Sequence, residues 1–217
     1  ALYLHQNTDI AVLTIFAKVS QSFSISEISV CSVYYSVVYG IEKVTNILHL
    51  SVEAAFCNMM AKGEKALFKK SFRTYELLSL MLNNFFFTCT AVLTVPFVSV
   101  YTLGITDADY IRPTFAYILT LSEMFYCLRK PYHNVTLAAG HYRQTKKGAF
   151  LEAGLNIGLS IILVIPFGIT GVAIGTAVAM GVRTFEYAIY LYKNILEERV
   201  ISFLAKLLVN VGACAVT

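Results

Sequence analysis

The stretch Ser122–Phe150 reads SEMFYCLRKPYHNVTLAAGHYRQTKKGAF. It begins inside a long apolar run, which carries Arg129 and Lys130 near its end and continues directly into Pro131. A segment of small residues and a basic turn follow, and a second apolar run departs from that turn. The pattern predicts two helices that meet at one face of a membrane, with a cationic pair at the end of the first where an anion can be held.

The composition predicts that most of the chain lies in lipid. Of the 217 residues, 57% are hydrophobic and only 14% are charged, and the mean hydropathy is +0.66. A soluble domain of this length has about a quarter of its residues charged. The net charge of +4 is spread between apolar segments, so no nucleic-acid partner is predicted. The five cysteines form no CxxC pair and the histidines share no ligand spacing, so neither a metal site nor a cofactor is predicted.

The fold predicted from the apolar runs is all-α, a polytopic membrane helix bundle of about six transmembrane helices plus the start of a seventh. The runs cover residues 1–19, 27–50 (with an extension toward 60), 75–103, 111–139, 147–165 and 169–196, and a further run starts near 200. Basic residues gather in every second connection, over 61–73, 129–147 and 193–206, which predicts that these connections face the cytoplasm. Both ends of the chain lie inside apolar runs, so we expect a piece of a longer protein.

Polar residues recur along one face of the predicted helix 111–139. Ser122, Tyr126, Arg129 and His133 follow one another at spacings of three and four, which places them on one helical face. Charged groups at membrane depth are costly unless they face a partner or a wet cavity. Pro131 removes a backbone hydrogen bond beside the arginine and predicts a bend there. We therefore expect this face to line a passage, with Arg129 as its anion-binding group.

Acidic residues near the middle of the membrane form a second group of candidates. Asp9, beside Asn7, lies near the midplane at a rise of about 1.5 Å per residue, and Glu123 lies at a similar depth. No basic residue precedes Lys18 on the helix that carries Asp9. Two interpretations stay open for Asp9: an ion- or proton-coupling carboxylate, or a protonated group in a tight interface. We predict Asp9, Asn7 and Glu123 as ion-coupling residues.

The helices 147–165 and 169–196 are expected to form a tight antiparallel hairpin. Arg183 is three residues before Glu186 and is level with Glu152 on the preceding helix, which predicts a structural ion pair among the three. Glycines four residues apart allow close helix packing, and this spacing occurs on both helices, at Gly154 and Gly158 and at Gly171 and Gly175.

Several segments resemble bacterial polysaccharide and oligosaccharide flippases of the multidrug/oligosaccharidyl-lipid/polysaccharide exporter superfamily. They are NTDIAVLTIF at 7–16, SVEAAFCNMMAKGE at 51–64, CLRKPYHNVTLAAGHYRQTKKGAFLEAGLNIGLSIILV at 127–164, and FGITGVAIGTAVAM at 167–180. The resemblance covers roughly residues 1–200. It implies that residues 1–198 are the C-terminal six-helix lobe of such a transporter and that 199–217 begin a further, truncated helix.

The resemblance also implies a function. A flippase of this kind moves an undecaprenyl-pyrophosphate-linked oligosaccharide across the bacterial inner membrane by alternating access. By position, Arg129 fits a cavity cation that meets the pyrophosphate, while Asp9 with Asn7 fits the ion-coupling role. The full set of expected substrate-binding residues is Arg129, Lys130, Tyr126, His133 and Asn134. The implied partners are the lipid-linked oligosaccharide, membrane lipids, a missing N-terminal lobe and the glycan polymerase machinery.

Three other functions are alternatives to a flippase. A cation-coupled drug antiporter of the same fold would use Asp9 and Glu123 as proton sites, and it is the main alternative. A membrane enzyme would need catalytic groups in long external loops, and the short turns here argue against it, so no catalytic residue is predicted. Charges buried on several helices argue against a purely structural scaffold.

Overall fold

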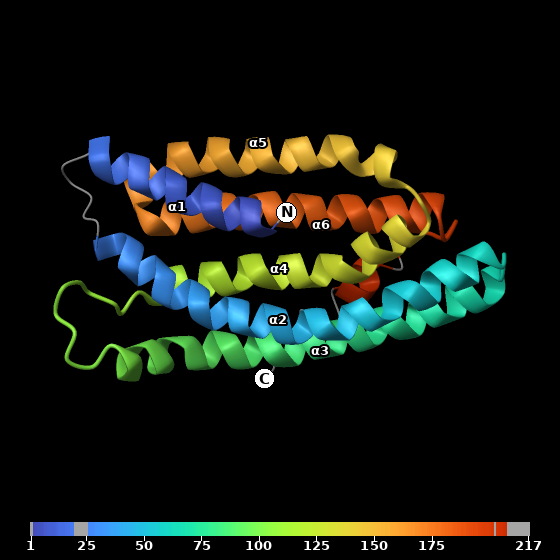
Figure 1. Cartoon of the computed structure of the whole chain (residues 1–217), viewed down its shortest axis with the longest axis horizontal. Coiled ribbons are helices and arrows are strands. Elements are labelled where there is room, and N and C mark those ends of the chain that lie inside the picture. The colour runs from blue at the N-terminus through green and yellow to red at the C-terminus, as the bar shows by residue number, and fades with distance from the viewer. Residues whose placement is uncertain (1, 20–25, 202, 208–217) are drawn as a thin grey trace.

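The protein is a bundle of long α-helices (Figure 1). The computed structural model describes residues 2–19, 26–201 and 203–207, without the side chains of 2–7, 17–19, 48, 50 and 51. No strand occurs among these residues. The helices are α1 (Leu2–Val19), α2 (Ser26–Ala61), α3 (Lys65–Tyr101), α4 (Pro113–Ala138), α5 (Tyr142–Phe167) and α6 (Ile169–Asn194). The all-α prediction is therefore confirmed.

Helix α4 occupies the centre of the bundle. It packs against α6 on one side and against α2 and α3 on the other (Figure 1). The α2–α3 and α5–α6 pairs are antiparallel hairpins, and α1 lies against α5 and α6. This position explains why the stretch 122–136 is almost entirely buried although it is rich in polar residues.

The α5–α6 hairpin is tight because of glycines on α6, but not on α5. A β-carbon at Gly171 would lie 2.0 Å from the Leu163 carbonyl oxygen, and one at Gly175 would lie 2.8 Å from the Ser160 nitrogen. A β-carbon at Gly154 or Gly158 would meet nothing within 4 Å. The prediction of small-residue packing is therefore right for α6 and wrong for α5, where these glycines face away from the partner helix.

The helices α2 and α3 are both longer than a membrane span; α2 matches the predicted run with its extension toward residue 60, whereas α3 begins ten residues before its predicted run. They contain 36 and 37 residues, about 55 Å at 1.5 Å per residue, whereas the hydrocarbon core of a bilayer is about 30 Å thick. The basic segment 61–73 was predicted as a connection, yet α3 begins at Lys65. The reason is that Phe68 and Phe72 pack on Phe56 of α2, with ring centroids 5.4 and 6.4 Å apart, while the cations point outward.

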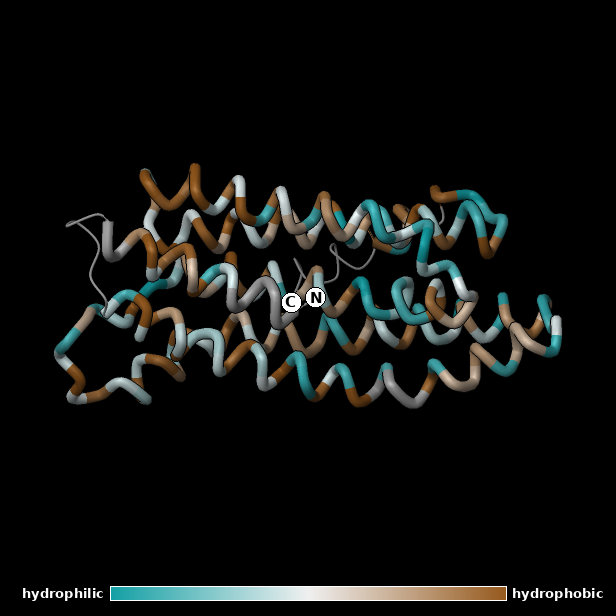
Figure 2. The backbone as a smooth tube through the Cα atoms, turned by 45° about the horizontal axis from the view of Figure 1, so that its top comes forward, coloured by the Kyte–Doolittle hydropathy of each residue, from teal (hydrophilic) through white to brown (hydrophobic). Residues whose placement is uncertain are grey.

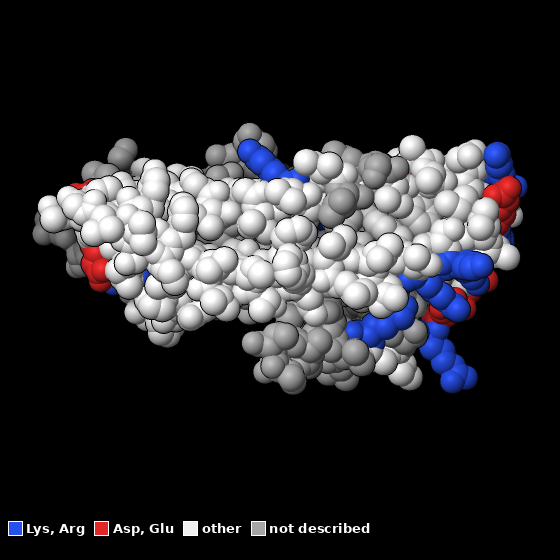
Figure 3. All heavy atoms as spheres, turned by 90° about the horizontal axis from the view of Figure 1, so that it is seen from below, with Lys and Arg blue, Asp and Glu red and all other residues white. Residues whose placement is uncertain are grey.

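Basic residues collect at the end of the bundle that holds the α2–α3 turn, the α4–α5 turn and the end of α6. We call it the basic end (Figure 3). Hydrophilic residues are also frequent there along the backbone (Figure 2). Its cations are Lys62, Lys65, Lys69, Lys70, Arg73, Arg143, Lys146, Lys147, Lys193 and Arg199. The helix α5 begins at Tyr142, not at the predicted residue 147, so Arg143 and Lys146 are helical as well.

Three helices, α3, α5 and α6, are long and apolar enough to cross a membrane. Large apolar side chains are exposed on the outer faces of α3 and α5, including Phe85, Val92, Ile161 and Ile165. Such contiguous exposure is unusual for a protein in water and is expected for a surface that contacts lipid. The chain is thus a membrane protein in its general class.

Candidate functional site

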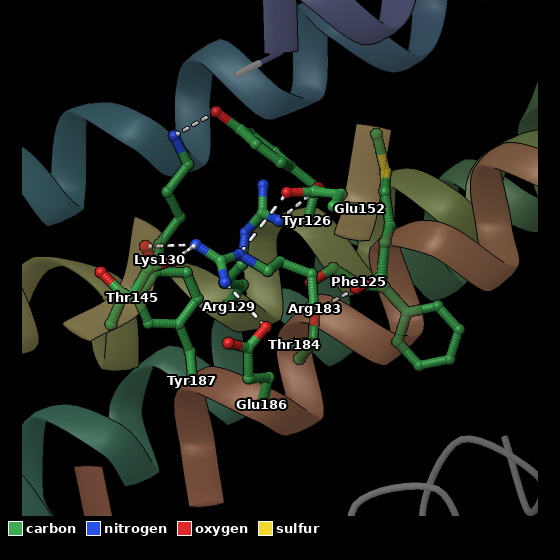
Figure 4. A network of polar contacts seen from close by, with 11 residues as sticks. Phe125, Tyr126, Arg129, Lys130, Thr145, Glu152, Arg183, Thr184, Glu186 and Tyr187 are labelled. Atoms are coloured by element: carbon green, nitrogen blue, oxygen red, sulfur yellow. Dashed lines mark hydrogen bonds and ion pairs between the residues drawn. The ribbon is translucent and has the colours of Figure 1, made fainter. Parts of the chain in front are cut away.

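Arg129 lies at the centre of a buried charge cluster. Its Nη1 donates a hydrogen bond to Glu152 Oε1 on α5 at 2.6 Å, and both side chains are only 5% exposed (Figure 4). The guanidinium carbon lies 4.8 Å from the ring centroid of Tyr126, one turn earlier on α4. A short charge-assisted bond in a buried site is a strong contact, so Arg129 is firmly held in this conformation.

Glu152 also contacts a second arginine, Arg183 on α6, with 3.6 Å between Nε and Oε2. Arg183 Nη1 lies 2.7 Å from Glu186 Oε2, and Arg183 Nη2 donates to the Thr145 carbonyl at 2.8 Å and to the Tyr187 hydroxyl at 3.0 Å (Figure 4). The structure thus brings the three residues of the predicted ion pair together and adds Arg129 to them. We call Arg129, Glu152, Arg183 and Glu186 the arginine cluster.

A glycine makes room for this cluster. A β-carbon at Gly148 would lie 1.8 Å from Arg183 Nη1 and 1.9 Å from Glu186 Oε2. No real side chain tolerates contacts of that length, so the α5 backbone approaches the ion pair where only hydrogen is present. Sequence analysis missed Gly148, whose only signal was its position between the basic turn and Glu152.

Lys130 points to the other side of α4. Its Nζ donates to Asn46 Oδ1 on α2 at 3.1 Å and to the Tyr126 hydroxyl at 2.9 Å, and lies 3.6 Å from Glu42 Oε1. Consecutive residues on a helix are about 100° apart, which is why Arg129 meets α5 while Lys130 meets α2. The Tyr126 ring lies between the two cations and contacts both, at 4.8 and 4.3 Å.

The polar face predicted on α4 is covered by other helices. Ser122 is fully buried and donates to its own helix at the Leu119 carbonyl. The His133 ring packs edge-on to Tyr187 of α6 at 5.0 Å, and its Nδ1 lies 3.2 Å from Asn134 Oδ1. Spacing identified the residues that share a face, but it could not show that α5 and α6 cover it.

Two hollows on the bundle surface lie elsewhere. One, of about 320 Å³, is lined by α2 and α3, and the other, of about 450 Å³, by α3 and α4. Residues of the arginine cluster line neither of them. In the conformation described, Arg129 is only 5% exposed and is ion-paired with Glu152 in the interior of the bundle.

Asp9 is the meeting point of four helices. Its carboxylate accepts hydrogen bonds from the Tyr35 hydroxyl of α2 at 2.9 Å, from the Thr176 hydroxyl of α6 at 2.9 Å and from Asn156 Nδ2 of α5 at 3.4 Å. Asn156 also donates to Thr176 Oγ1 at 2.8 Å. All four side chains are buried. We call them the Asp9 cluster; the side chain of Asn7, predicted beside it, lies outside the described residues.

Glu123 is buried on α4 with 1% exposure. Its Oε2 has no hydrogen-bond partner among the residues that the structure describes. A buried carboxyl oxygen without a partner is costly, so Glu123 is a candidate for a group that gains a proton or another partner. The donors to Asp9 named above, Tyr35, Thr176 and Asn156, lie on α2, α6 and α5, whereas Glu123 lies on α4.

No family model, curated protein or solved structure matches this chain. Sequence analysis missed three members of the Asp9 cluster, Tyr35, Asn156 and Thr176, and also Asn46, which accepts a hydrogen bond from Lys130. Their only signal was a polar side chain within an apolar run, which many membrane helices contain.

Proposed function

We propose that this chain is the C-terminal lobe of a membrane transporter that moves an undecaprenyl-pyrophosphate-linked oligosaccharide across the bacterial inner membrane by alternating access. One observation carries the proposal: two buried arginines, Arg129 and Arg183, contact the same carboxylate of Glu152. Two guanidinium groups that converge on one carboxylate form a site whose anion a diphosphate can replace, because phosphate oxygens match the same fork of donors.

In an alternating-access mechanism, the ion-paired interior around Arg129 corresponds to a conformation without substrate. In the conformation described, Glu152 holds the place of the substrate anion, and a transporter of this kind must release it in another conformation. The membrane topology that fits is six spans over residues 1–198, with the basic end in the cytoplasm and a seventh span from 199 onward. The apolar helices α3, α5 and α6 and the segregation of cations to one end support it.

The Asp9 cluster supplies the coupling in this proposal. It places one carboxylate, two hydroxyl oxygens and one amide among α1, α2, α5 and α6. A proton or a hard monovalent cation suits oxygen ligands of this kind. Because its ligands belong to four helices, occupancy of the site changes how those helices pack and can bias one conformation over another.

The decisive experiment replaces Arg129 in the full-length transporter. Arg129→Ala is expected to abolish export of surface glycan, and Arg129→Lys to reduce it strongly, because an ammonium cannot form the bidentate contact. The control is Arg143→Ala, which removes an exposed cation at the same end of the bundle. Normal export by both Arg129 variants, at equal protein levels in the membrane, would refute Arg129 as the anion-binding group.

The second candidate function is a cation-coupled drug antiporter of the same fold, and the unpartnered Oε2 of Glu123 favours it. Glu123→Gln separates the two, with Asp9→Asn for comparison. An antiporter that uses Glu123 as its proton site loses dye efflux driven by a proton gradient in Glu123→Gln. The flippase proposal expects glycan export to survive Glu123→Gln and to lose its dependence on the ion gradient in Asp9→Asn.

A further inference from the structure

Another buried carboxylate outside the arginine and Asp9 clusters is that of Glu76. It is 0% exposed and lies in the first third of α3, the helix that starts at the basic end. It accepts hydrogen bonds from the hydroxyl of Tyr132 on α4 at 2.9 Å and from the hydroxyl of Tyr192 on α6 at 2.8 Å. The third donor is Lys206 Nζ, which also contacts the Tyr192 hydroxyl at 3.0 Å.

Lys206 comes from the segment that follows α6. Within residues 200–207, Phe203 is 1% exposed and packs on Tyr132, Phe185 and Tyr192, with ring centroids 5.4, 6.0 and 6.2 Å apart. Phe203 and Lys206 are three residues apart, the spacing that places both on one helical face. One face of this short segment therefore inserts an aromatic ring and a cation into the bundle.

The ammonium of Lys206 neutralises a charge that would otherwise be expensive. A carboxylate taken fully out of water needs a paired cation and satisfied hydrogen bonds. Among the described residues, Lys206 is the cation that contacts Glu76, while the tyrosines supply neutral donors. Removal of Lys206 alone leaves the carboxylate buried without its counter-charge.

The contact of Lys206 with Glu76 also links helices on opposite sides of the bundle. The helices α3 and α6 lie on opposite sides of α4 (Figure 1). Through Glu76, Tyr192 and Lys206, α3 and α6 are joined around α4 near the basic end. Lys206 keeps 31% of its side chain exposed, so it reaches the carboxylate from the surface. Residues 197–199, just before the segment, are not helical, so the segment is an element separate from α6.

We propose that residues 200, 201 and 203–207 are a closing segment, which seals the basic end of the bundle when Lys206 pairs with Glu76 and Phe203 packs into the aromatic cluster of Tyr132, Phe185 and Tyr192, and which leaves when that end opens. The Tyr132 and Tyr192 hydroxyls remain as donors to Glu76 when Lys206 departs. The closing segment is thus a conformational device of the fold that depends on no particular substrate.

Thiol labelling of the full chain tests the proposal without any transport assay. The reporter is Val135→Cys, at a position that is 0% exposed within the aromatic cluster. In the background, the exposed Cys57 and Cys89, and also Cys214, are replaced by alanine. A membrane-permeant maleimide is expected to label the reporter slowly in this parent, and at least about tenfold faster after Lys206→Met, because the closing segment loses its ion pair.

Three variants complete the test. Lys193→Met removes an exposed cation at the same end and is expected to label at the parent rate. Lys206→Arg keeps the charge and is expected to label nearly as slowly as the parent. Glu76→Gln/Lys206→Met removes both charges, and its reporter is expected to be labelled more slowly than that of Lys206→Met alone. If Lys206→Met fails to fold, the labelling rate of this double variant tests the proposal in its place. Labelling of Lys206→Met at the parent rate, or equal acceleration by Lys193→Met, would overturn the proposal.

Discussion

The arginine cluster predicts a large loss of stability in Glu152→Gln. The substitution keeps the shape and one acceptor oxygen but removes the charge that contacts Arg129 and Arg183. Removing one partner of a buried ion pair costs roughly 3–5 kcal/mol. The lower end applies here, because Arg183 retains Glu186 and the Thr145 carbonyl. For a chain of this size, a loss of about 3 kcal/mol lowers Tm by roughly 6–12 °C.

The measurement is thermal unfolding of the purified protein in detergent, with Glu64→Gln as the control. Glu64 is exposed at the start of α3 and its side chain makes no capping hydrogen bond, so this variant is expected to melt within about 1–2 °C of the parent. Both variants replace a glutamate by glutamine. A difference in Tm between them therefore comes from the buried site and not from the loss of one negative charge.

A double variant tests whether the loss of stability comes from an arginine left without its carboxylate. If the cost comes from an uncompensated guanidinium, removing Arg129 as well must recover most of it, since replacing a buried pair by apolar groups is often close to neutral. Arg129→Met/Glu152→Met is therefore expected to melt above Glu152→Gln. Equal melting of Glu152→Gln and the parent would refute the view that Glu152 compensates the two arginines.

Three further changes are measured in the same melting assay, the first two with matched controls. Gly171→Ala forces a β-carbon into the α5 backbone and is expected to destabilise by about 2 kcal/mol or more, whereas Gly154→Ala enters open space and is expected to be neutral or stabilising; the reverse order would contradict the hairpin packing. Thr176→Val removes a buried donor to the Asp9 carboxylate and is expected to cost about 1–3 kcal/mol, and an equal loss in the partly exposed Thr170→Val would show that the hydroxyl contact is irrelevant. Tyr34→Phe removes the hydroxyl that bonds the 110–112 backbone and is expected to cost about 1 kcal/mol, a result that an unchanged Tm would disprove.

The sequence predicted the helices better than their contacts. Long apolar runs without the alternating pattern of barrel strands satisfy their backbone in lipid as helices, so the order of elements followed from the apolar runs alone. The ends were harder to place: the start of α3 was predicted ten residues too late, because lysines and an arginine suggested a connection while Phe68 and Phe72 beside them bury against α2. Charge marks the outer face of a helix, and it does not mark where the helix ends.

The predicted site residues show the same limit. Arg183, Glu186 and Glu152 were grouped because spacing and depth suffice when the partners lie on one helix and its hairpin neighbour. Arg129 and Lys130 are adjacent in sequence, and only the packing of α4 against two different neighbours shows that they serve different carboxylates. Glu76 was missed because its donors come from residues 132, 192 and 206, which no local pattern connects.

Three of the buried carboxylates, those of Asp9, Glu152 and Glu76, are tied to the same helix. Along α6, Thr176 bonds to Asp9, Arg183 contacts Glu152, and Tyr192 bonds to Glu76. These three residues are about 10 and 14 Å apart at 1.5 Å per residue, so they contact the rest of the bundle at three levels. A shift of α6 along or around its axis therefore strains the three polar contacts together, since packed cores change between discrete arrangements and do not deform continuously. Coupling between the Asp9 cluster, the arginine cluster and the closing segment then needs no long chain of side chains, because one rigid helix carries a residue of each cluster and also Tyr192, which contacts Lys206 of the closing segment.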